Sequence, residues 1–135
     1  MIKLVIVCHG ALADGLVNAM ELIAGSQPDV LAVSLEEDES IDGLEETIEK
    51  IVKERQDGQE VLILVDLFGA SPFNVSARVA NRNPGVEVIT GVNLAMLLET
   101  ALGRENMTLI ELTGLAREAS ANSVKVLSNL LESGG

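Results

Sequence analysis

The stretch that decides the fold of this chain is Ile2-Lys3-Leu4-Val5-Ile6-Val7-Cys8-His9-Gly10. Its first part is mostly β-branched and apolar, which is typical of a strand covered on both faces of a parallel sheet. Such sheets collect ligands and chemistry at the carboxyl ends of their strands. His9, the only histidine of the chain, stands at that end. Position alone allows two interpretations of His9. It either merely ends a strand or takes part in chemistry near neutral pH.

Strand-like and helix-like segments alternate along the rest of the chain. Three more apolar runs predict strands, at Val30–Leu35, Val61–Val65 and Val86–Ile89. Each strand is followed by apolar residues at helical spacing. Ser71 is expected to be the N-cap of one helix, with Pro72 at its first helical position, where a missing N–H has no cost.

This alternation predicts an α/β fold, a flavodoxin-like parallel sheet in the order 2-1-3-4 flanked by helices. In that order the first and third strands are neighbours. His9 and Asp66, the residues at or just after their ends, are therefore expected to meet across the crevice. Asp66 by itself is also compatible with a plain turn residue. The 135 residues show no linker or repeat, so we expect one domain, residues 1–135.

The composition excludes several classes of protein. One cysteine allows no intramolecular disulfide, and one Cys with one His cannot supply the four ligands of a structural zinc site. No signal peptide is visible, and no apolar stretch approaches the ~20 residues that span a bilayer. We expect a soluble protein of the reducing cytoplasm, without a metal or another cofactor.

The charge argues against nucleic acid as a partner. Lys and Arg total 9 against 21 Asp and Glu, a formal net charge of -12. Such a surface repels nucleic acid and anionic membranes. With two Phe and no Trp or Tyr, the chain also has almost nothing on which bases could stack.

A carboxylate beside His9 is expected to accept its Nδ1–H and leave Nε2 with a free lone pair. If Nε2 acted as a general base, it would need a nearby hydroxyl to deprotonate. The only candidate is Ser71, whose hydroxyl is expected to cap a helix. Cys8 is expected to point to the opposite face of the strand as a buried packing residue. One nitrogen and one carboxylate are too few for a metal. Nucleophilic attack by His9 itself remains.

The surroundings of His9 favour a phosphoryl group as the electrophile. Three loops of small residues meet at this edge: Gly10-Ala11, Gly69-Ala70-Ser71 and Gly91-Val92-Asn93. Their backbone amides can approach oxygens closely, and two helices direct their positive ends there. No Gly-x-x-x-x-Gly-Lys-Ser/Thr motif is present, so nucleotide binding has no support. We interpret the site as a phosphohistidine relay with Gly10, Gly69, Ala70 and Ser71 as phosphate-binding residues.

The chain resembles the enzyme IIA component of the mannose-type sugar phosphotransferase system. The matching stretches are Val5–Gly10, Val65–Asn74 and Gly91–Leu97, in order and at suitable spacing. The resemblance covers essentially the whole chain, and the Asp66–Asn74 stretch is its most specific part. Phe68 stands where some members of that family carry Trp, and Ala70 stands where glycine is usual.

The resemblance implies that His9 accepts phosphate from the histidine-containing phosphocarrier protein and passes it to a IIB component, with Asp66 orienting the ring. Because the chain ends early, the IIB partner is expected to be separate. The membrane is reached only indirectly, through the sugar permease. The resemblance also implies a homodimer in which an antiparallel C-terminal strand is exchanged, and Val124–Leu127 is the candidate strand.

Leu12, Leu67, Phe68 and Met96 lie in or beside the loops around His9 and are expected to form an apolar docking rim for partner proteins. Phe68 is also compatible with packing in the core. The alternative function is a regulatory module of the same fold, or one that feeds phosphate to a dihydroxyacetone kinase.

Overall fold

The computed structural model describes residues 1–132 and has a four-stranded parallel sheet in the order β2-β1-β3-β4. The strands are β1 (Lys3–His9), β2 (Val30–Leu35), β3 (Val61–Val65) and β4 (Val86–Ile89). The predicted strand order is confirmed. Register pairs Val7 of β1 with Val65 of β3, so these neighbouring strands end together at one edge.

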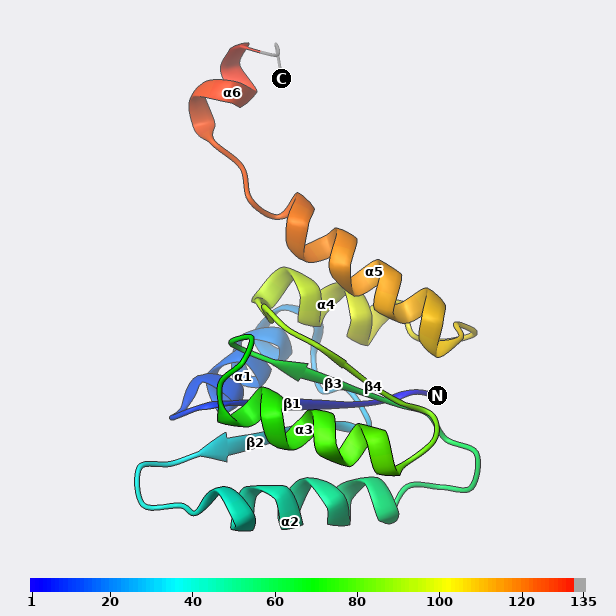
Figure 1. Ribbon diagram of the computed structural model, residues 1–135. Coiled ribbons are helices and arrows are strands. Elements are labelled where there is room, and N and C mark those ends of the chain that lie inside the picture. Colours follow the sequence, from blue (N-terminus) through cyan, green and yellow to red (C-terminus); the bar gives the residue numbers. More distant parts are fainter. Residues whose placement is uncertain (133–135) are drawn as a thin grey trace.

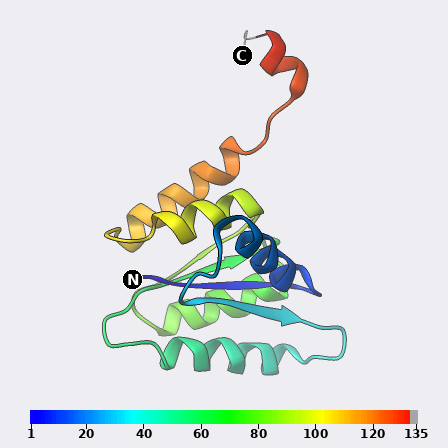
Figure 2. The same ribbon diagram turned by 180° about the vertical axis from the view of Figure 1, so that it is seen from behind.

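Helices cover both faces of the sheet (Figures 1 and 2). On one face lie α1 (Leu12–Ala24), α4 (Leu94–Gly103) and α5 (Leu109–Asn122), and on the other lie α2 (Ile41–Lys53) and α3 (Ser71–Arg82). Successive side chains of a strand point to opposite faces, so continuous apolar strands serve two cores. Leu4, Ile6 and Cys8 of β1 enter the first core, and Val5 and Val7 enter the second.

Polar side chains cap α2, α4 and α5, whereas α1 and α3 begin without a side-chain cap. The Ser40 hydroxyl accepts the Gly43 N–H at 2.9 Å and caps α2. The prediction that Ser71 is an N-cap is wrong, because α3 begins at Ser71 and Ala70 occupies the capping position. The chain turns into the helix one residue earlier than the Ser-Pro signal indicates. The Ser71 hydroxyl is therefore not used in capping.

The C-terminal segment differs from the expected strand. Residues 124–126 have no regular structure, and Leu127 begins the short helix α6 (Leu127–Glu132). Val124–Leu127 therefore forms no strand in the single chain, and its exchange as a strand in a dimer stays a prediction. Residues 123–132, called the C-terminal arm below, lead away from the body beyond α5 (Figures 1 and 2). Its apolar side chains are exposed: Val124, Val126, Leu127, Leu130 and Leu131.

The opposite, amino edge of the sheet is closed by a buried arginine. Arg104 is 1% exposed. Its guanidinium donates to the carbonyls of Ile2 and Asp29 at 3.0 and 3.1 Å, and also to that of Pro28. One cation thus ties the chain entering β1 to the loop before β2. No helix within residues 1–132 is long and apolar enough to cross a membrane.

Candidate active site

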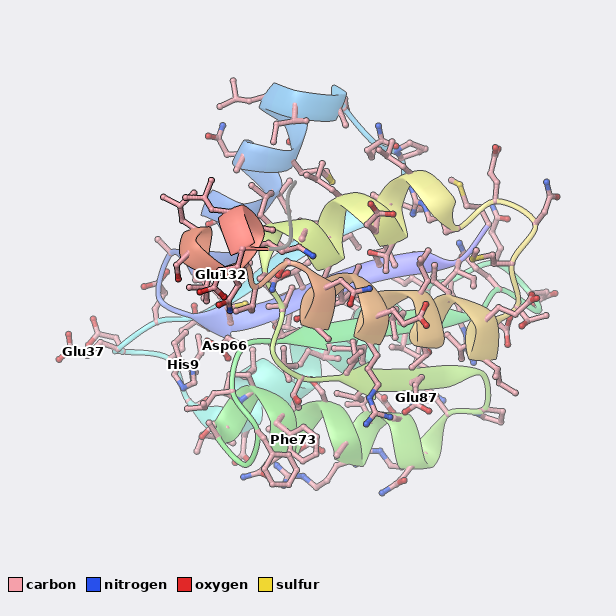
Figure 3. The ribbon with its side chains drawn as sticks, turned by 90° about the horizontal axis from the view of Figure 1, so that it is seen from above. His9, Glu37, Asp66, Phe73, Glu87 and Glu132 are labelled. Carbon is pink, nitrogen blue, oxygen red and sulfur yellow. The ribbon has the colours of Figure 1, made fainter. Side chains whose placement is uncertain are left out.

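His9 and Asp66 meet at the carboxyl edge of the sheet, as predicted from the strand order (Figure 3). His9 is the last residue of β1, and Asp66 directly follows β3. The same carboxylate oxygen, Oδ2 of Asp66, lies 2.8 Å from Nδ1 of His9 and accepts the His9 backbone N–H at 2.9 Å. Two contacts to one oxygen therefore fix both the backbone and the ring of His9.

These contacts assign the tautomer of the imidazole. A carboxylate only accepts, so Nδ1 carries the proton and Nε2 keeps its lone pair. Within residues 1–132, Nε2 of His9 makes no hydrogen bond. The His9 side chain is 46% exposed, whereas that of Asp66 is 12% exposed. A half-buried carboxylate thus orients an imidazole whose Nε2 faces solvent.

Asp66 stays ionised despite its burial. Burial raises the pKa of this carboxyl, but the hydrogen bonds and charge of His9 outweigh it and hold the pKa below its ordinary value. The second oxygen, Oδ1, is buried and has no hydrogen-bond partner among the described residues. The backbone N–H and the ring Nδ1 of His9 thus share Oδ2, and within the described part of the chain Oδ1 is left unpaired. Most buried polar atoms are paired, so this arrangement orients the ring at the expense of a hydrogen bond to Oδ1.

Cys8 is excluded as a nucleophile. Its side chain is buried in the core on the α1 side of the sheet, as predicted. Burial, with the negative charge of Asp66, raises the pKa of the Cys8 thiol to about 12. The thiolate, which is the reactive form, is therefore essentially absent at neutral pH.

Two glycines shape the loops beside His9. Gly10 has a φ of +56° and Gly69 a φ of +82°, in the left-handed region that side chains with a Cβ adopt at a cost. A Cβ built at either glycine would lie in open space. Backbone conformation rather than crowding therefore requires glycine at both positions.

The first turn of α3 supplies unpaired donors at the same edge. The Ser71 hydroxyl and the amides of Ser71 and Phe73 have no partner among the described residues, as is usual for the first turn of a helix. Asn74 fastens this loop, because its Nδ2 donates to the Gly69 carbonyl at 3.1 Å. Sequence reasoning quoted Asn74 in a motif but assigned it no role; its place in the first turn of a helix, just after a glycine-containing loop, was the available signal.

Three of the four residues predicted to form a docking rim are exposed, and one is buried. The side chains of Leu12, Leu67 and Phe68 are exposed, Phe68 to 74%. The Phe68 ring packs on that of Phe73, with 4.9 Å between the ring centroids. Met96, however, is 1% exposed and belongs to the core, so its prediction as a docking residue is wrong. Met96 is the third residue of α4, and at this position the side chain points toward the core.

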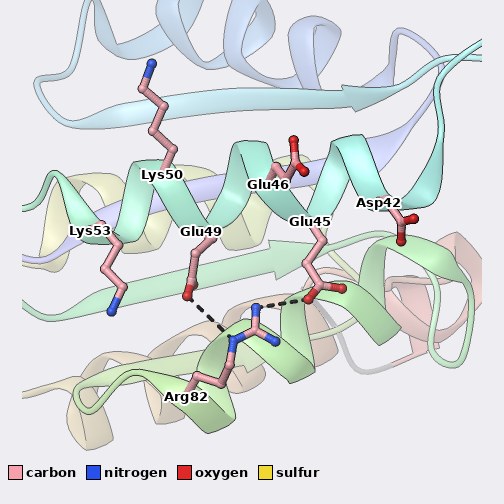
Figure 4. Close-up of a pocket in the computed structure, with 7 residues that line it drawn as sticks. All are labelled: Asp42, Glu45, Glu46, Glu49, Lys50, Lys53 and Arg82. Carbon is pink, nitrogen blue, oxygen red and sulfur yellow. Dashed lines mark ion pairs between the residues drawn. The ribbon is translucent and has the colours of Figure 1, made fainter.

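A hollow of about 520 Å³ lies away from His9, along α2 and α3 (Figure 4). Within it, Arg82 pairs with Glu45 at 2.9 Å and with Glu49 at 3.5 Å. These ion pairs connect the two helices across the groove. Among residues 1–132, no group of three or more His, Cys, Asp or Glu side chains could hold a metal ion.

Comparison with known proteins identifies the class and then the family. A family model described as "PTS system fructose IIA component" matches residues 3–116, so the chain is a component of a sugar phosphotransferase system (PTS). More narrowly, it belongs to the family of mannose-type IIA components.

Individual relatives agree with this assignment. The chain is 33% identical over 132 residues to the PTS system fructose-specific EIIA component of Bacillus subtilis (strain 168), a match of 98% of this chain and 90% of that protein. It is 35% identical over 127 residues to the mannose-specific EIIAB component of Escherichia coli (strain K12), which covers 93% of this chain and only 39% of that longer protein.

A solved structure agrees in fold. The crystal structure of the phosphotransferase system component EIIA from Streptococcus agalactiae superposes with a TM-score of 0.89 at 31% identity. The match covers 96% of this chain and 99% of that one. The α/β architecture is thus shared over nearly the full length of both proteins.

Proposed function

We propose that this IIA component relays phosphate on His9, accepting it from the histidine-containing phosphocarrier protein and passing it to a separate IIB component during sugar uptake. The observation that carries the proposal is the double contact of His9 with Oδ2 of Asp66. It leaves Nε2 as an accessible lone pair on a ring of fixed orientation.

In the proposed step, the Nε2 lone pair of His9 attacks phosphorus of the donor's phosphohistidine. The donor's P–N bond breaks, and its electron pair stays on the donor imidazole. His9 develops imidazolium character, which the adjacent Asp66 carboxylate stabilises. The reverse displacement, by a nucleophile of the IIB component, returns His9 to its starting state.

We assign the phosphate oxygens to the residues of the surrounding loops. Gly10, Gly69 and Ala70 would offer close approach to the backbone, and Ser71 would offer its hydroxyl and amide. The unpaired first turn of α3 supports this assignment, because helix N-termini attract anions. No cofactor is needed for the step, since the phosphoryl group is itself the cargo.

The proposed partners meet the exposed rim of Leu12, Leu67 and Phe68. A relay visited by one partner after another needs small, short-lived interfaces. We further propose a homodimer formed through the C-terminal arm, whose apolar side chains are exposed in the single chain. The relay would work in the cytoplasm and reach the membrane only through the sugar permease, with no role for nucleic acid.

Phosphate transfer from a labelled donor tests the proposal. Wild-type protein should take up one phosphate per chain, in a linkage that acid cleaves and base does not. His9→Ala should take up none, because the nucleophile is lost. Labelled wild type should then lose its phosphate to a cognate IIB component. Equal labelling of His9→Ala would refute the assignment, and labelling without any transfer to IIB proteins would favour the regulatory alternative.

A further inference from the structure

The loop Gly91–Asn93 is fastened to the strand that carries the site. It leaves β4 and leads into α4. Its Val92 N–H donates to the carbonyl of Val65 at 3.1 Å, and Val65 directly precedes Asp66. Whatever sets the position of Val92 therefore acts on the backbone that holds the Asp66 carboxylate against His9.

The Asn93 side chain has two separate functions in this loop. Its Oδ1 accepts the Met96 N–H at 2.8 Å and caps α4. Its Nδ2 donates to the hydroxyls of Ser120 and Ser123 at 3.1 and 3.2 Å. Because the cap requires the oxygen to face α4, the amide nitrogen must face the two serines, at the end of α5 and just after it.

The hydroxyl of each serine in turn donates a hydrogen bond to a backbone carbonyl. The Ser123 hydroxyl donates to the Ser120 carbonyl at 2.7 Å, and the Ser120 hydroxyl lies 3.4 Å from the Gly91 carbonyl. Both hydroxyls thus accept from Asn93 and donate onward, so the donors and acceptors match throughout. Such a matched network holds its members in one arrangement.

Capping alone does not account for this residue. Ser, Thr or Asp can also cap a helix, but none of them carries an amide NH₂ that donates two hydrogen bonds elsewhere. The amide donors of Asn93 connect the loop to Ser123, the first residue of the C-terminal arm. Figure 1 shows this arm leading away beyond α5.

We infer that Asn93 is a positioning residue for phosphoryl transfer: its amide holds the Gly91–Asn93 loop to the end of α5 and, through Val92 and Val65, sets the Asp66–His9 pair. The inference rests on the proposed relay function of His9. It also makes the root of the C-terminal arm part of the support of the site.

Two variants remove the link from opposite ends. Asn93→Ser keeps a neutral helix cap but loses both amide donors. The double variant Ser120→Ala/Ser123→Ala keeps the Asn93 cap and loses both acceptors, so it remains informative if Asn93→Ser fails to fold. Ser26→Ala is the matched control, because Ser26 is exposed in the loop between α1 and β2, outside both the network and the arm.

Amide hydrogen exchange and ¹⁵N NMR measure the effect of the Asn93–serine hydrogen bonds on the loop and on His9. Neither measurement needs a phosphate donor. Loss of the network should speed exchange of the Val92 amide by about tenfold, the effect of one hydrogen bond or a little more. His9 is the only histidine, so its two ring nitrogens give unambiguous signals. Both link variants should shift these signals toward mixed tautomers, and Ser120→Thr should retain the wild-type signals.

Single-turnover transfer completes the test. Both link variants should slow transfer by about 3- to 10-fold at unchanged donor KM, and combining them should add little, since they break one network. Folded variants with wild-type His9 signals and wild-type rates would overturn the inference. A wild-type protein that takes up no phosphate would instead overturn the proposed function, which the NMR measurements do not depend on.

Discussion

At the scale of single residues, one oxygen determines the site. Oδ2 of Asp66 contacts both the backbone N–H and the ring of His9, so the imidazole cannot rotate without losing a charged partner. Charge-assisted hydrogen bonds of this kind are stronger than neutral ones. The proposed nucleophile is thus oriented in the free protein.

Asp66→Asn should fold but transfer phosphate on the order of 10²-fold more slowly, by analogy with orienting carboxylates of catalytic triads. The amide permits the wrong tautomer and removes the charge that stabilises the imidazolium. Single-turnover labelling measures the rate. Asp38→Asn, an exposed acid of the β2–α2 loop, is the control and should leave the rate unchanged. An unchanged rate in Asp66→Asn would make Asp66 structural only.

Phe68→Ala should raise the KM for the phosphocarrier donor by about fivefold to tenfold, the effect of losing one exposed aromatic anchor at an interface. The stability of the phosphohistidine should not change. Initial rates against donor concentration measure KM, with Leu102→Ala, an equally apolar exposed residue at the far end of α4, as control. A normal KM with faster hydrolysis would instead make Phe68 a shield against water.

Residue-level predictions succeeded where position in a strand decides the outcome. The meeting of His9 with Asp66 and the burial of Cys8 follow from strand order and alternation. Met96 and Ser71 were misplaced because each lies in the first turn of a helix. There, a shift of one position rotates a side chain by about 100°, from the surface to the core or from a cap to the first turn.

At the scale of elements, α2 and α3 are joined by a cluster of ion pairs. Glu45 contacts Arg78 at 2.8 Å and Arg82 at 2.9 Å. Hydrogen bonds from Arg78 and Arg82 hold the pKa of the Glu45 carboxyl below its ordinary value. The groove in Figure 4 is therefore a helix-to-helix contact with a role in stability.

Glu45→Gln should lower the thermal unfolding midpoint slightly at neutral pH, because exposed pairs contribute little each. A lowered folded pKa gives stability that is complete above the ordinary value of 4.5 and is lost as the pH falls through the folded value. The difference from wild type should therefore vanish in acid. Melting curves between neutral pH and about pH 3 test this, with Glu46→Gln, on the same helix, as control. A constant difference would exclude the ion pairs as its cause.

The elements themselves were predictable from periodicity. Val61-Leu62-Ile63-Leu64-Val65 could only be a strand buried on both faces, and the structure confirms its bounds. The C-terminal run Val124–Leu127 also has two β-branched valines and a leucine, yet it forms no strand in the single chain. A β-strand needs a neighbouring strand to pair with its backbone. A pattern within four residues does not reveal whether such a neighbouring strand is present.

At the scale of the whole molecule, we expect the dimer to depend on the C-terminal arm. Truncation after Asn122 removes the exposed apolar residues of the arm and should give monomers. Light scattering at micromolar concentration should show the full chain as a dimer. Ser26→Ala, an exposed position outside the arm, is the control and should remain dimeric. A monomeric full chain would refute the prediction.

The short helix at the end of the arm has a consequence of its own. Six residues are too few for a helix that is stable in water by itself, and the segment before it, Val124-Lys125-Val126, has strand-forming residues. Neither conformation is secured by the local sequence, so the surroundings of the arm decide between them. We therefore expect the arm to change conformation with its surroundings: helical while the chain is alone, and extended if a neighbouring strand edge offers its backbone groups.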